Sequence, residues 1–538
     1  MKLENIYIGL LLVLTVLLNI NNLDLPYYWD DFNYVIPAVD YVYRNVPTIF
    51  LWEYGLGHPP FFFNLAGLIF KLFGDSVLLG HLIILIFSFL AVLFTYLTGK
   101  ELFSRKVGII ASLLLLFTPI FVSYSSLFYL EMPLTALIIM SIYFAIKKKP
   151  YLSILCGSLV VLTKEIAIVA VIALFLVKLF KEKKKALIYV TPILIFLLLL
   201  IANKIHYGHF LFPISTSLIN IDPIRNAVII LAILKSIFFD QFRWILTSVI
   251  ILSLISKKSF KKDKKQIILA LASSLILIGL IFSLRFLKLN IYFPNINNYL
   301  SLVEKISIFI AMLFFLLILH SKEFFKLYIK KDLYELYLPL LFLIGAHFII
   351  IPYPQRYGLP AYPLLFLIFA FAISNLFKKY SYLFVIFIIS LFIISFTGDR
   401  SLAGFALEDN LEYRDFIIVR QQAANFISEN YPDATVLVAY PMSLDLQHEY
   451  GKYLTKKLDV ITMDPYGGGL TNKNYTQFLY PETIPEQNIN LSEIDLYYYS
   501  PQEYPNQKIY NLRDQLNLTL IKRFEVNNKV AEIYLVNK

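Results

Sequence analysis

Long apolar runs, separated by short clusters of lysine and arginine, recur over most of this 538-residue chain. Hydrophobic residues make up 58% of the sequence and charged residues only 16%, whereas an average soluble domain has about 25% charged residues. A soluble chain with this composition would expose large apolar patches, so the apolar surplus needs lipid as its solvent. The pattern therefore predicts a polytopic α-helical membrane protein.

Thirteen of these runs are candidate transmembrane helices, because a span needs about 20 apolar residues and shorter ones are tolerated inside a bundle. The first run, Ile6–Ile20, lacks the small-residue cleavage site of a removable signal peptide, so we expect it to remain as a span. The candidates lie at approximately 5–22, 77–98, 107–122, 131–146, 151–163, 166–180, 186–203, 244–256, 266–284, 303–320, 336–352, 360–377 and 380–397.

The distribution of charge predicts the orientation of these spans. With the N-terminus in the cytoplasm, the cytoplasmic loops carry 23 Lys/Arg in short clusters, and the opposite side carries 11 over longer stretches. This is the positive-inside distribution of membrane proteins. An odd number of spans then places the C-terminal tail outside the cytoplasm. We expect a multi-pass protein of the cell (plasma or inner) membrane.

The net charge of +11 combines two parts of opposite sign. Residues 399–538 contain 13 Lys/Arg and 19 Asp/Glu, a net charge of −6, whereas residues 1–398 contain 35 basic and 18 acidic residues, or +17. Because the positive excess lies between apolar runs, membrane topology explains it, and we expect no nucleic-acid partner. The single cysteine, Cys156, excludes a disulfide framework and a cysteine-based zinc site.

Two domains are expected, a transmembrane domain at 1–398 and a small extracytoplasmic α/β domain at 399–538. The transmembrane domain includes a long first outer loop, about 23–76, whose segment Phe61–Phe73 is too short to cross and is expected in the membrane interface. In the tail we expect a helix at Glu412–Asn430, strands at Thr435–Ala439 and Asp459–Met463, and a hairpin of Leu518–Phe524 and Val530–Val536 around Asn527-Asn528.

The segment Trp29-Asp30-Asp31-Phe32-Asn33-Tyr34 follows the first span directly. Two adjacent carboxylates at a membrane surface are costly unless something uses them. One carboxylate near a reacting hydroxyl could accept its proton, and a neighbouring acid can raise its pKa toward that task. The structural alternative is a solvated pair that caps the following helix. Asp30 and Asp31 are candidate catalytic residues with that alternative open.

Two further candidates have ionisable side chains at the outer ends of apolar segments. His58 precedes Pro59-Pro60 and could hydrogen-bond a phosphate or a hydroxyl, although a His-Pro-Pro sequence also occurs as a simple turn. Glu131 is an acid at the outer edge of the fourth span, and intramembrane acids are functional candidates. Its alternative is an acid favoured by the dipole of a helix N-terminus.

Two cations lie on the same predicted outer side. Lys164, in Thr163-Lys164-Glu165, could neutralise a lipid phosphate, and a snorkelling Lys–Glu pair is the alternative. Arg356, followed by Tyr357 in a short loop, offers several donors in a fixed fork that suits phosphate. An interfacial anchor is the alternative there. Lys164, Arg356 and Tyr357 are candidate donor-phosphate or substrate-binding residues.

The order and spacing of these residues resemble the GT-C glycosyltransferases of the protein O-mannosyltransferase and aminoarabinose-transferase type (glycosyltransferase family 39-type). Those enzymes have an acidic pair with a later Tyr, a Pro-Pro step, a second acid before Pro, a Thr-Lys step and an Arg-Tyr-x-x-Pro loop. The matching residues here are Asp30-Asp31 with Tyr34, Pro59-Pro60, Glu131 with Pro133, Thr163-Lys164, and Arg356-Tyr357 with Pro360. The resemblance covers about residues 1–400, and the thirteen-span layout with an outer α/β tail agrees with the aminoarabinose branch.

The resemblance assigns roles to the matching acids. Asp30 matches the family's first acid, the expected base or acceptor-binding carboxylate. Asp31 replaces a frequent Glu. Glu131 stands where Asp is usual, which puts a shared metal or substrate contact there in doubt.

The resemblance also assigns roles to the matching basic residues. His58 occupies a position that is Lys in the aminoarabinose branch, which argues against assuming that donor or a lipid A acceptor. Lys164 and Arg356 match positions expected near the carrier phosphate.

The resemblance implies transfer of one monosaccharide from a polyprenyl- or dolichyl-phosphate sugar to a lipid, glycan or protein acceptor at the outer surface. Asp30 would orient or deprotonate the acceptor hydroxyl, with inversion at the sugar carbon, while the cations stabilise the leaving phosphate. No nucleotide is needed, in keeping with the lack of a Gly-rich phosphate loop in the sequence. A divalent metal ion held by the acids is left open.

Other classes of protein remain as alternatives. A multi-span transporter of a lipid-linked or small polar substrate fits the intramembrane charges, but transporters often have repeated halves and the sequence has no such repeat. An oligosaccharyltransferase-like enzyme would be expected to carry Trp-Trp-Asp in its soluble domain, whereas Trp29, Trp52 and Trp244 all precede the tail. A receptor or scaffold leaves Asp30 and Asp31 unexplained.

Overall fold

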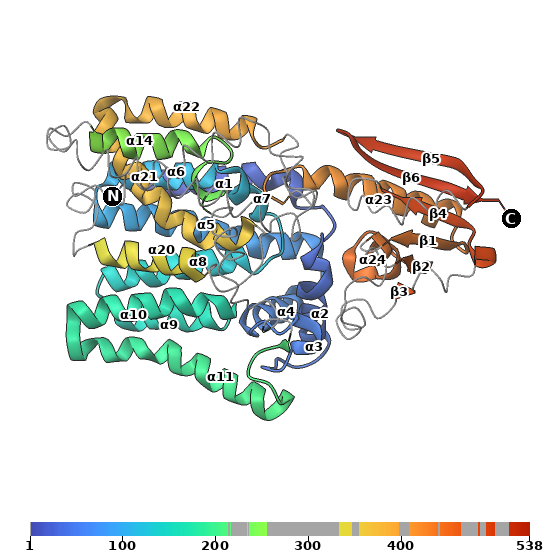
Figure 1. Cartoon of the computed structure of the whole chain (residues 1–538), viewed down its shortest axis with the longest axis horizontal. Helices are drawn as coiled ribbons and strands as arrows, with labels where there is room; N and C mark the ends of the chain where they lie inside the picture. Colours follow the sequence, from blue (N-terminus) through green and yellow to red (C-terminus); the bar gives the residue numbers. More distant parts are fainter. Residues whose placement is uncertain are drawn as a thin grey trace, which may run out of the picture.

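A helical bundle and a six-stranded sheet at one end of it make up the described structure (Figure 1). The computed structural model describes residues 2–213, 236–255, 333–346, 355–397, 408–439, 442–463, 483–484, 491–500 and 516–537, with positions 216 and 234. The helices of the bundle run in roughly the same direction, and the sheet lies beyond their ends rather than beside them (Figure 1).

The bundle contains most of the apolar runs of the sequence. Its longer helices are α1 (Lys2–Asn19), α5 (Val77–Leu102), α6 (Arg105–Leu116), α8 (Glu131–Ile146), α9 (Pro150–Val161), α10 (Ile168–Glu182), α11 (Thr191–Tyr207), α14 (Arg243–Ile255), α20 (Tyr334–Ala346), α21 (Tyr362–Phe377) and α22 (Ser381–Ile394). Within the described residues, four helical segments are long and apolar enough to cross a membrane: Leu3–Asn22, Val77–Leu102, Glu165–Tyr207 and Arg356–Ile394. The prediction of a polytopic α-helical membrane protein is therefore confirmed, apart from its number of spans.

The number of thirteen spans stays a prediction, and the candidates at 266–284 and 303–320 lie outside the described residues. Not every predicted run forms one helix. The run 186–203 crosses from the 3₁₀ helix η4 (Lys183–Val190) into α11. The run 107–122 is split into α6 and the short α7 (Pro119–Tyr124). Proline has no backbone N–H to donate to the preceding turn, so Pro119 begins a new helix instead of continuing α6.

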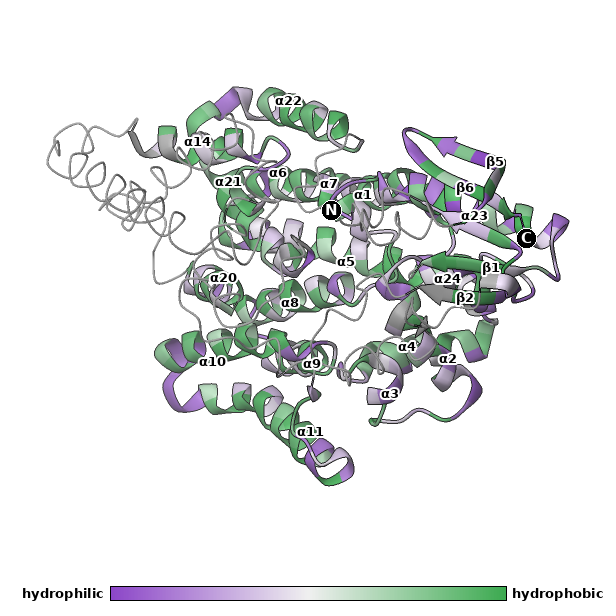
Figure 2. Cartoon of the chain, turned by 45° about the vertical axis from the view of Figure 1, so that its right-hand side comes forward, coloured by the Kyte–Doolittle hydropathy of each residue, from purple (hydrophilic) through white to green (hydrophobic). Residues whose placement is uncertain are grey.

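Large apolar side chains remain exposed on the outer helices. The hydropathy colouring shows that apolar residues predominate along these helices (Figure 2). On α11, Leu198 is 64% exposed and Ile205 is 81% exposed, and on α22 Leu383 is 67% exposed. Exposed apolar area of this kind is unfavourable in water and neutral in lipid. The outer surface of the bundle is therefore suited to acyl chains.

The first outer loop folds back over the end of the bundle as short helices. These are the π-helix η2 (Asp31–Val35), α2 (Ile36–Arg44), α3 (Trp52–Gly55) and α4 (Phe61–Phe73). Helix α4 packs on α2 at Gly67, where an added Cβ would lie 2.6 Å from the Val42 side chain. Its far end is exposed at Leu72 and Phe73. The interfacial location predicted for α4 stays a prediction.

The tail contains a mixed sheet with the order β3-β2-β1-β4-β6-β5. Its strands are β1 (Thr435–Ala439), β2 (Asp459–Met463), β3 (Thr483–Ile484), β4 (Leu496–Tyr499), β5 (Leu518–Val526) and β6 (Lys529–Val536). The first four pair in parallel, and β6 and β5 continue the sheet as an antiparallel hairpin. Asn527 and Asn528 have φ of +46° and +70°, the conformation that a two-residue hairpin turn requires.

The predicted elements of the tail agree closely with these strands. The predicted helix at Glu412–Asn430 is observed as α23 (Tyr413–Asn430). The structure adds β3, β4 and the helix α24 (Met442–Gln447), which the sequence did not indicate. Strand β4 is short and fully buried, so it lacks the alternation that identifies a half-buried strand.

The tail contacts the first outer loop directly. The Tyr27 backbone N–H donates to the Gly451 carbonyl oxygen at 3.2 Å, and the Lys452 ammonium lies 2.7 Å from the Asp75 carboxylate. A side chain at Gly451 would overlap the Phe32 ring, because an added Cβ would lie 1.6 Å from it. The tail therefore covers the end of the bundle at which the first outer loop lies.

Helices α5 and α6 pack closely against each other at Gly108. An added Cβ at Gly108 of α6 would lie 2.4 Å from the Tyr96 carbonyl oxygen of α5, whereas at Gly9 of α1 it would meet nothing within 4 Å. Gly108→Ala should destabilise the protein by about 1–3 kcal/mol through overpacking. Gly9→Ala, the matched control, should be neutral or stabilising by up to about 1 kcal/mol. Equal thermal unfolding midpoints for both variants in detergent would contradict this helix contact.

Candidate active site

Asp30 lies where the chain leaves α1 and enters the π-helix η2. Its predecessor Trp29 has a φ of +50°, which is uncommon for a residue with a side chain and marks a sharp local turn. The Asp30 backbone N–H donates to the Tyr129 hydroxyl at 3.2 Å. The turn and this hydrogen bond hold the Asp30 carboxylate toward the interior of the bundle end.

Asp31 is 1% exposed and forms no ion pair with Arg356 among the described residues. Its carboxylate accepts the Tyr28 backbone N–H at 3.4 Å, and burial raises its pKa well above the usual range for aspartate. The two predicted acids therefore occupy different environments. Asp30 faces the charged cluster described below, whereas Asp31 lies against backbone.

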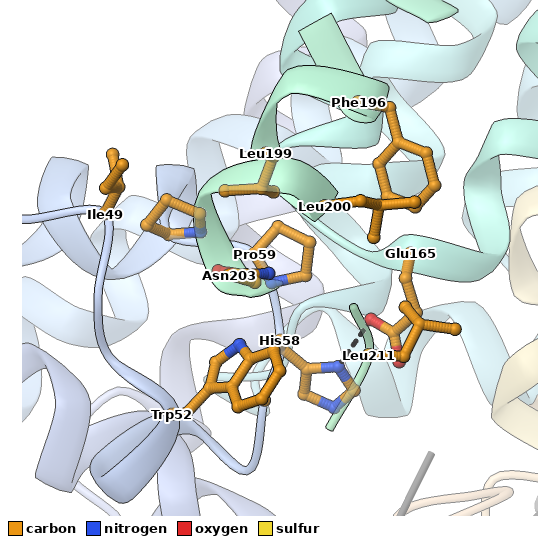
Figure 3. A pocket seen from close by; sticks show the side chains of 12 residues that line it. Ile49, Trp52, His58, Pro59, Glu165, Phe196, Leu199, Leu200, Asn203 and Leu211 are labelled. Atoms are coloured by element: carbon orange, nitrogen blue, oxygen red, sulfur yellow. Dashed lines mark hydrogen bonds and ion pairs between the residues drawn. The ribbon is translucent and has the colours of Figure 1, made fainter. Parts of the chain in front are cut away.

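His58 lies in a pocket on the other side of the first outer loop (Figure 3). Its Nδ1 is 2.9 Å from a carboxylate oxygen of Glu165, and its ring centroid is 5.2 Å from that of Tyr34. This pocket also contains Trp52 and Asn203. No contact between His58 and the cations Lys164 or Arg356 is found in the described part of the chain.

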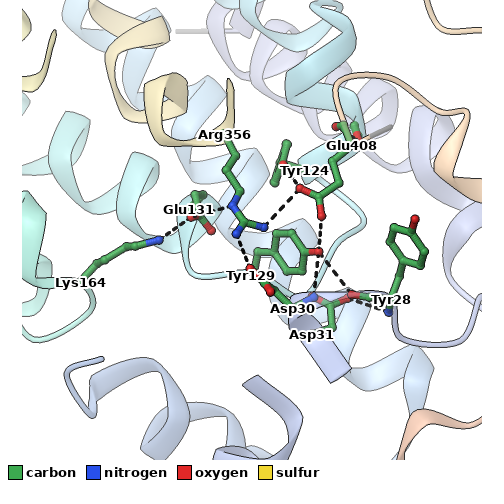
Figure 4. A network of polar contacts seen from close by, with 10 residues as sticks. Tyr28, Asp30, Asp31, Tyr124, Tyr129, Glu131, Lys164, Arg356 and Glu408 are labelled. Atoms are coloured by element: carbon green, nitrogen blue, oxygen red, sulfur yellow. Dashed lines mark hydrogen bonds and ion pairs between the residues drawn. The ribbon is translucent and has the colours of Figure 1, made fainter. Parts of the chain in front are cut away.

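Arg356, on the 3₁₀ helix η7 (Gln355–Ala361), joins three carboxylates from distant parts of the chain (Figure 4). Its guanidinium forms an ion pair with Asp30, lies 3.3 Å from Glu408, and approaches Glu131 with Nε at 3.8 Å. Arg356 is 6% exposed. A buried guanidinium requires such partners, because an unpaired charge away from water is costly.

Lys164 extends the same cluster into the bundle (Figure 4). Its ammonium is 2.5 Å from a Glu131 carboxylate oxygen and 4.4 Å from the centroid of the Tyr357 ring. The Lys164 and Glu131 side chains are 3% and 1% exposed. Glu131 thus links Lys164 to Arg356, and Tyr357 covers the lysine.

Glu408, at the start of the tail, was not foreseen from the sequence. Its carboxylate accepts hydrogen bonds from the Tyr124 hydroxyl at 2.5 Å and the Tyr129 hydroxyl at 2.6 Å. Burial raises its pKa, although Arg356 opposes that shift. Only the acidic pair Glu408-Asp409 after the last apolar run could have indicated this residue, and such acids are common in polar tails.

A pocket with polar and apolar walls borders the cluster. Glu131, Lys164 and Tyr357 form its polar part. Its remaining lining residues are apolar and come from α8, α10, α20 and their neighbours: Leu134, Ile166, Ala167, Val169, Leu343, Ala346 and Pro360. A charged group on an apolar chain would find matching surroundings here.

The carboxylates are not arranged for a metal ion. Among the residues that the structure describes, no group of three or more His, Cys, Asp or Glu side chains could hold one. Asp30, Glu131 and Glu408 each face Arg356 instead of a common point. The acids as they stand fit cations of the protein itself.

Comparison with known proteins agrees with this architecture. Residues 57–206 match the family described as dolichyl-phosphate-mannose-protein mannosyltransferase, and no curated protein matches the chain. The structure is similar to that of ArnT from Cupriavidus metallidurans bound to undecaprenyl phosphate, with a TM-score of 0.50 and 12% identity over 98% of each chain. The resemblance to the GT-C glycosyltransferases is confirmed.

A second structure, the archaeal oligosaccharyltransferase AglB from Archaeoglobus fulgidus in complex with an inhibitory peptide and a dolichol-phosphate, aligns with a TM-score of 0.46. The two are 12% identical, and the alignment covers 98% of this chain and 74% of that chain.

The match to the mannosyltransferase family covers only part of the cluster. It contains Glu131 and Lys164, while Asp30, Arg356 and Glu408 lie outside residues 57–206. The helical bundle completes the site by bringing these outer segments against the matched one.

The buried pair of Glu131 and Lys164 can be tested by a double-mutant cycle. Lys164→Met should destabilise the protein by about 3–5 kcal/mol, because it leaves Glu131 buried with less compensation. Adding Glu131→Gln should recover part of that loss. The matched pair Glu101 and Lys147, 3.0 Å apart with side chains 40% and 37% exposed, should show a coupling below about 1 kcal/mol. Similar couplings in unfolding measurements on both pairs would contradict the burial of the first.

The environment of Asp31 predicts a dependence of stability on pH. Its raised pKa means that the folded protein holds a proton that the unfolded chain loses, so stability should fall as pH rises above the unfolded pKa of about 4. Asp31→Asn should remove this loss, so its advantage in thermal midpoint over the parent protein should grow between pH 5 and pH 8. A constant difference across that range would contradict a proton on Asp31.

Proposed function

We propose that this protein transfers a monosaccharide from a polyprenyl- or dolichyl-phosphate donor to an acceptor at the extracytoplasmic surface. The observation that carries the proposal is the pocket where Lys164, Glu131 and Tyr357 meet apolar side chains, beside Arg356. Its walls suit the first isoprene units of a carrier lipid, and its polar part suits a phosphate. The undecaprenyl phosphate bound to ArnT supports the same kind of donor.

Lys164 and Arg356 would stabilise the leaving phosphate. When the bond between the sugar and the phosphate breaks, a phosphodiester with one negative charge becomes a phosphomonoester with two. Both cations are almost fully buried, so their interaction with that new charge is weakly screened. To reach it, they would exchange carboxylate contacts for phosphate oxygens.

Asp30 would act on the acceptor. Its carboxylate would take the proton of an acceptor hydroxyl as that oxygen forms a bond to the anomeric carbon. The phosphate leaves from the opposite face, so the configuration inverts. In the described structure Arg356 pairs with Asp30. Phosphate binding to Arg356 would therefore free Asp30 to act as the base.

We further propose the topology that the charge distribution indicates. The N-terminus would be cytoplasmic, residues 1–398 would form the catalytic domain, and residues 399–538 an extracytoplasmic domain. Contacts of the tail with the first outer loop, through Gly451 and Lys452, support a tail on the same side as Asp30. The tail would then border the route of the acceptor.

The role of Asp30 can be tested with a panel of radiolabelled polyprenyl-phosphate sugars and protein in lipid. Asp30→Asn should lower sugar transfer by about 10²–10⁴-fold, the usual contribution of general-base catalysis, while donor binding persists. Asp40→Asn is the matched control, since Asp40 lies on α2 of the same loop. Its carboxylate forms a surface ion pair with Arg44, with 2.8 Å between the carboxylate oxygen and Nε. This control variant should retain full activity.

Unchanged turnover in Asp30→Asn would contradict the role of Asp30 as the base. The proposal that the protein is a glycosyltransferase would still hold. A folded parent protein that neither binds nor consumes any donor of the panel would contradict the transferase and favour a transporter.

A further inference from the structure

A second pocket lies next to the phosphate pocket and has no role in the mechanism above. It is formed by the first outer loop and α11, and its polar lining residues are His58, Glu165 and Asn203, with Trp52 as an aromatic wall (Figure 3). Apolar residues of α11, among them Leu199 and Leu200, form the rest of its wall.

Asn203 shows that this pocket is suited to a polar ligand. It is 5% exposed, it lines the pocket, and its side-chain oxygen has no hydrogen-bond partner within the described residues. A buried acceptor without a partner costs about 1–3 kcal/mol. A ligand in the pocket that donates a hydrogen bond to this oxygen would remove that cost.

The neighbouring groups complete the chemistry that recognises a sugar ring. The His58–Glu165 pair offers donor and acceptor atoms and retains 14% and 20% exposure, so a ligand can reach it. Trp52 is held by a parallel stack on Tyr207, with ring centroids 4.4 Å apart. A sugar presents hydroxyls around its edge and C–H groups on its faces, which match polar side chains beside an aromatic wall.

The chain itself places this pocket beside the phosphate pocket. Lys164 lines the phosphate pocket and Glu165 lines the second one, although the two residues are consecutive. The two pockets therefore border the same short stretch of chain. In the proposed donor, the sugar is bonded directly to the phosphate.

We propose that the pocket of Trp52, His58, Glu165 and Asn203 binds the sugar ring of the lipid-phosphate donor. This inference rests on the proposed function and gives His58 a role toward the sugar rather than the phosphate. The two ionisable side chains that line the pocket, His58 and Glu165, contact each other.

Binding measurements can separate sugar recognition from phosphate recognition. The full chain in lipid nanodiscs is titrated with polyprenyl-phosphate mannose, glucose and galactose, and with the bare polyprenyl phosphate. Asn203→Leu should weaken binding of the preferred glycosylated donor about tenfold, which equals about 1.4 kcal/mol. It should leave binding of the bare carrier unchanged. Lys164→Met should weaken both.

Asn19→Leu is the matched control, because Asn19 is also a buried helical amide whose oxygen has no partner among the described residues, and it does not line the pocket. It should bind both probes like the parent protein. Equal effects of Asn203→Leu on both probes, or none on either, would overturn the inference while donor turnover by the parent protein upholds the proposed function. A parent protein that binds no donor would overturn both.

A measurement without pocket substitutions covers the case in which Asn203→Leu fails to fold. Trp52 becomes the sole tryptophan in the Trp29→Phe/Trp244→Phe variant, because the chain contains three tryptophans. Its fluorescence should change on addition of the glycosylated donor and stay constant with the bare carrier. The same response to both probes, or to neither, would overturn the inference.

Discussion

The buried guanidinium of Arg356 is the interaction on which the candidate active site depends. It contacts Asp30 from the first outer loop, Glu131 from the start of α8 and Glu408 from the start of the tail. A charge at 6% exposure is tolerable only when such partners are present. The cluster can therefore form only when four separate segments have assembled, which ties the active-site geometry to the completed fold of the bundle and to the start of the tail.

The carboxylates at this end of the bundle differ through their surroundings. Asp30 pairs with Arg356, whereas Asp31 lies against backbone and burial raises its pKa. Glu408 is held by the hydroxyls of two tyrosines, and burial raises its pKa as well. If Glu408 is protonated, the carboxylates of Asp30 and Glu131 face the two cations Lys164 and Arg356. The net charge of the buried cluster would then be close to zero before any phosphate enters.

Two pockets meet at the Lys164–Glu165 step, and this arrangement agrees with a donor that has a lipid end, a phosphate and a sugar. Apolar residues surround the lysine, which suits the carrier chain, while the glutamate faces His58 and the aromatic wall of Trp52. One backbone turn, made by the 3₁₀ helix η3 (Glu165–Ala167), directs the two side chains into different pockets. The acyl-compatible outer surface of the bundle gives the carrier a continuous apolar environment.

The sequence by itself determined the apolar helices, the strands β1 and β2, and the hairpin at Asn527-Asn528, because hydropathy and turn conformation depend on neighbouring residues. It also nominated Asp30, Glu131, Lys164, Arg356 and Tyr357, which the fold brings together. Only the tertiary structure decided that Glu408 joins them, that Asp31 bonds to backbone and that His58 lies in a second pocket. Those outcomes depend on ion pairs and burial between segments far apart in the chain, and no local pattern encodes such contacts.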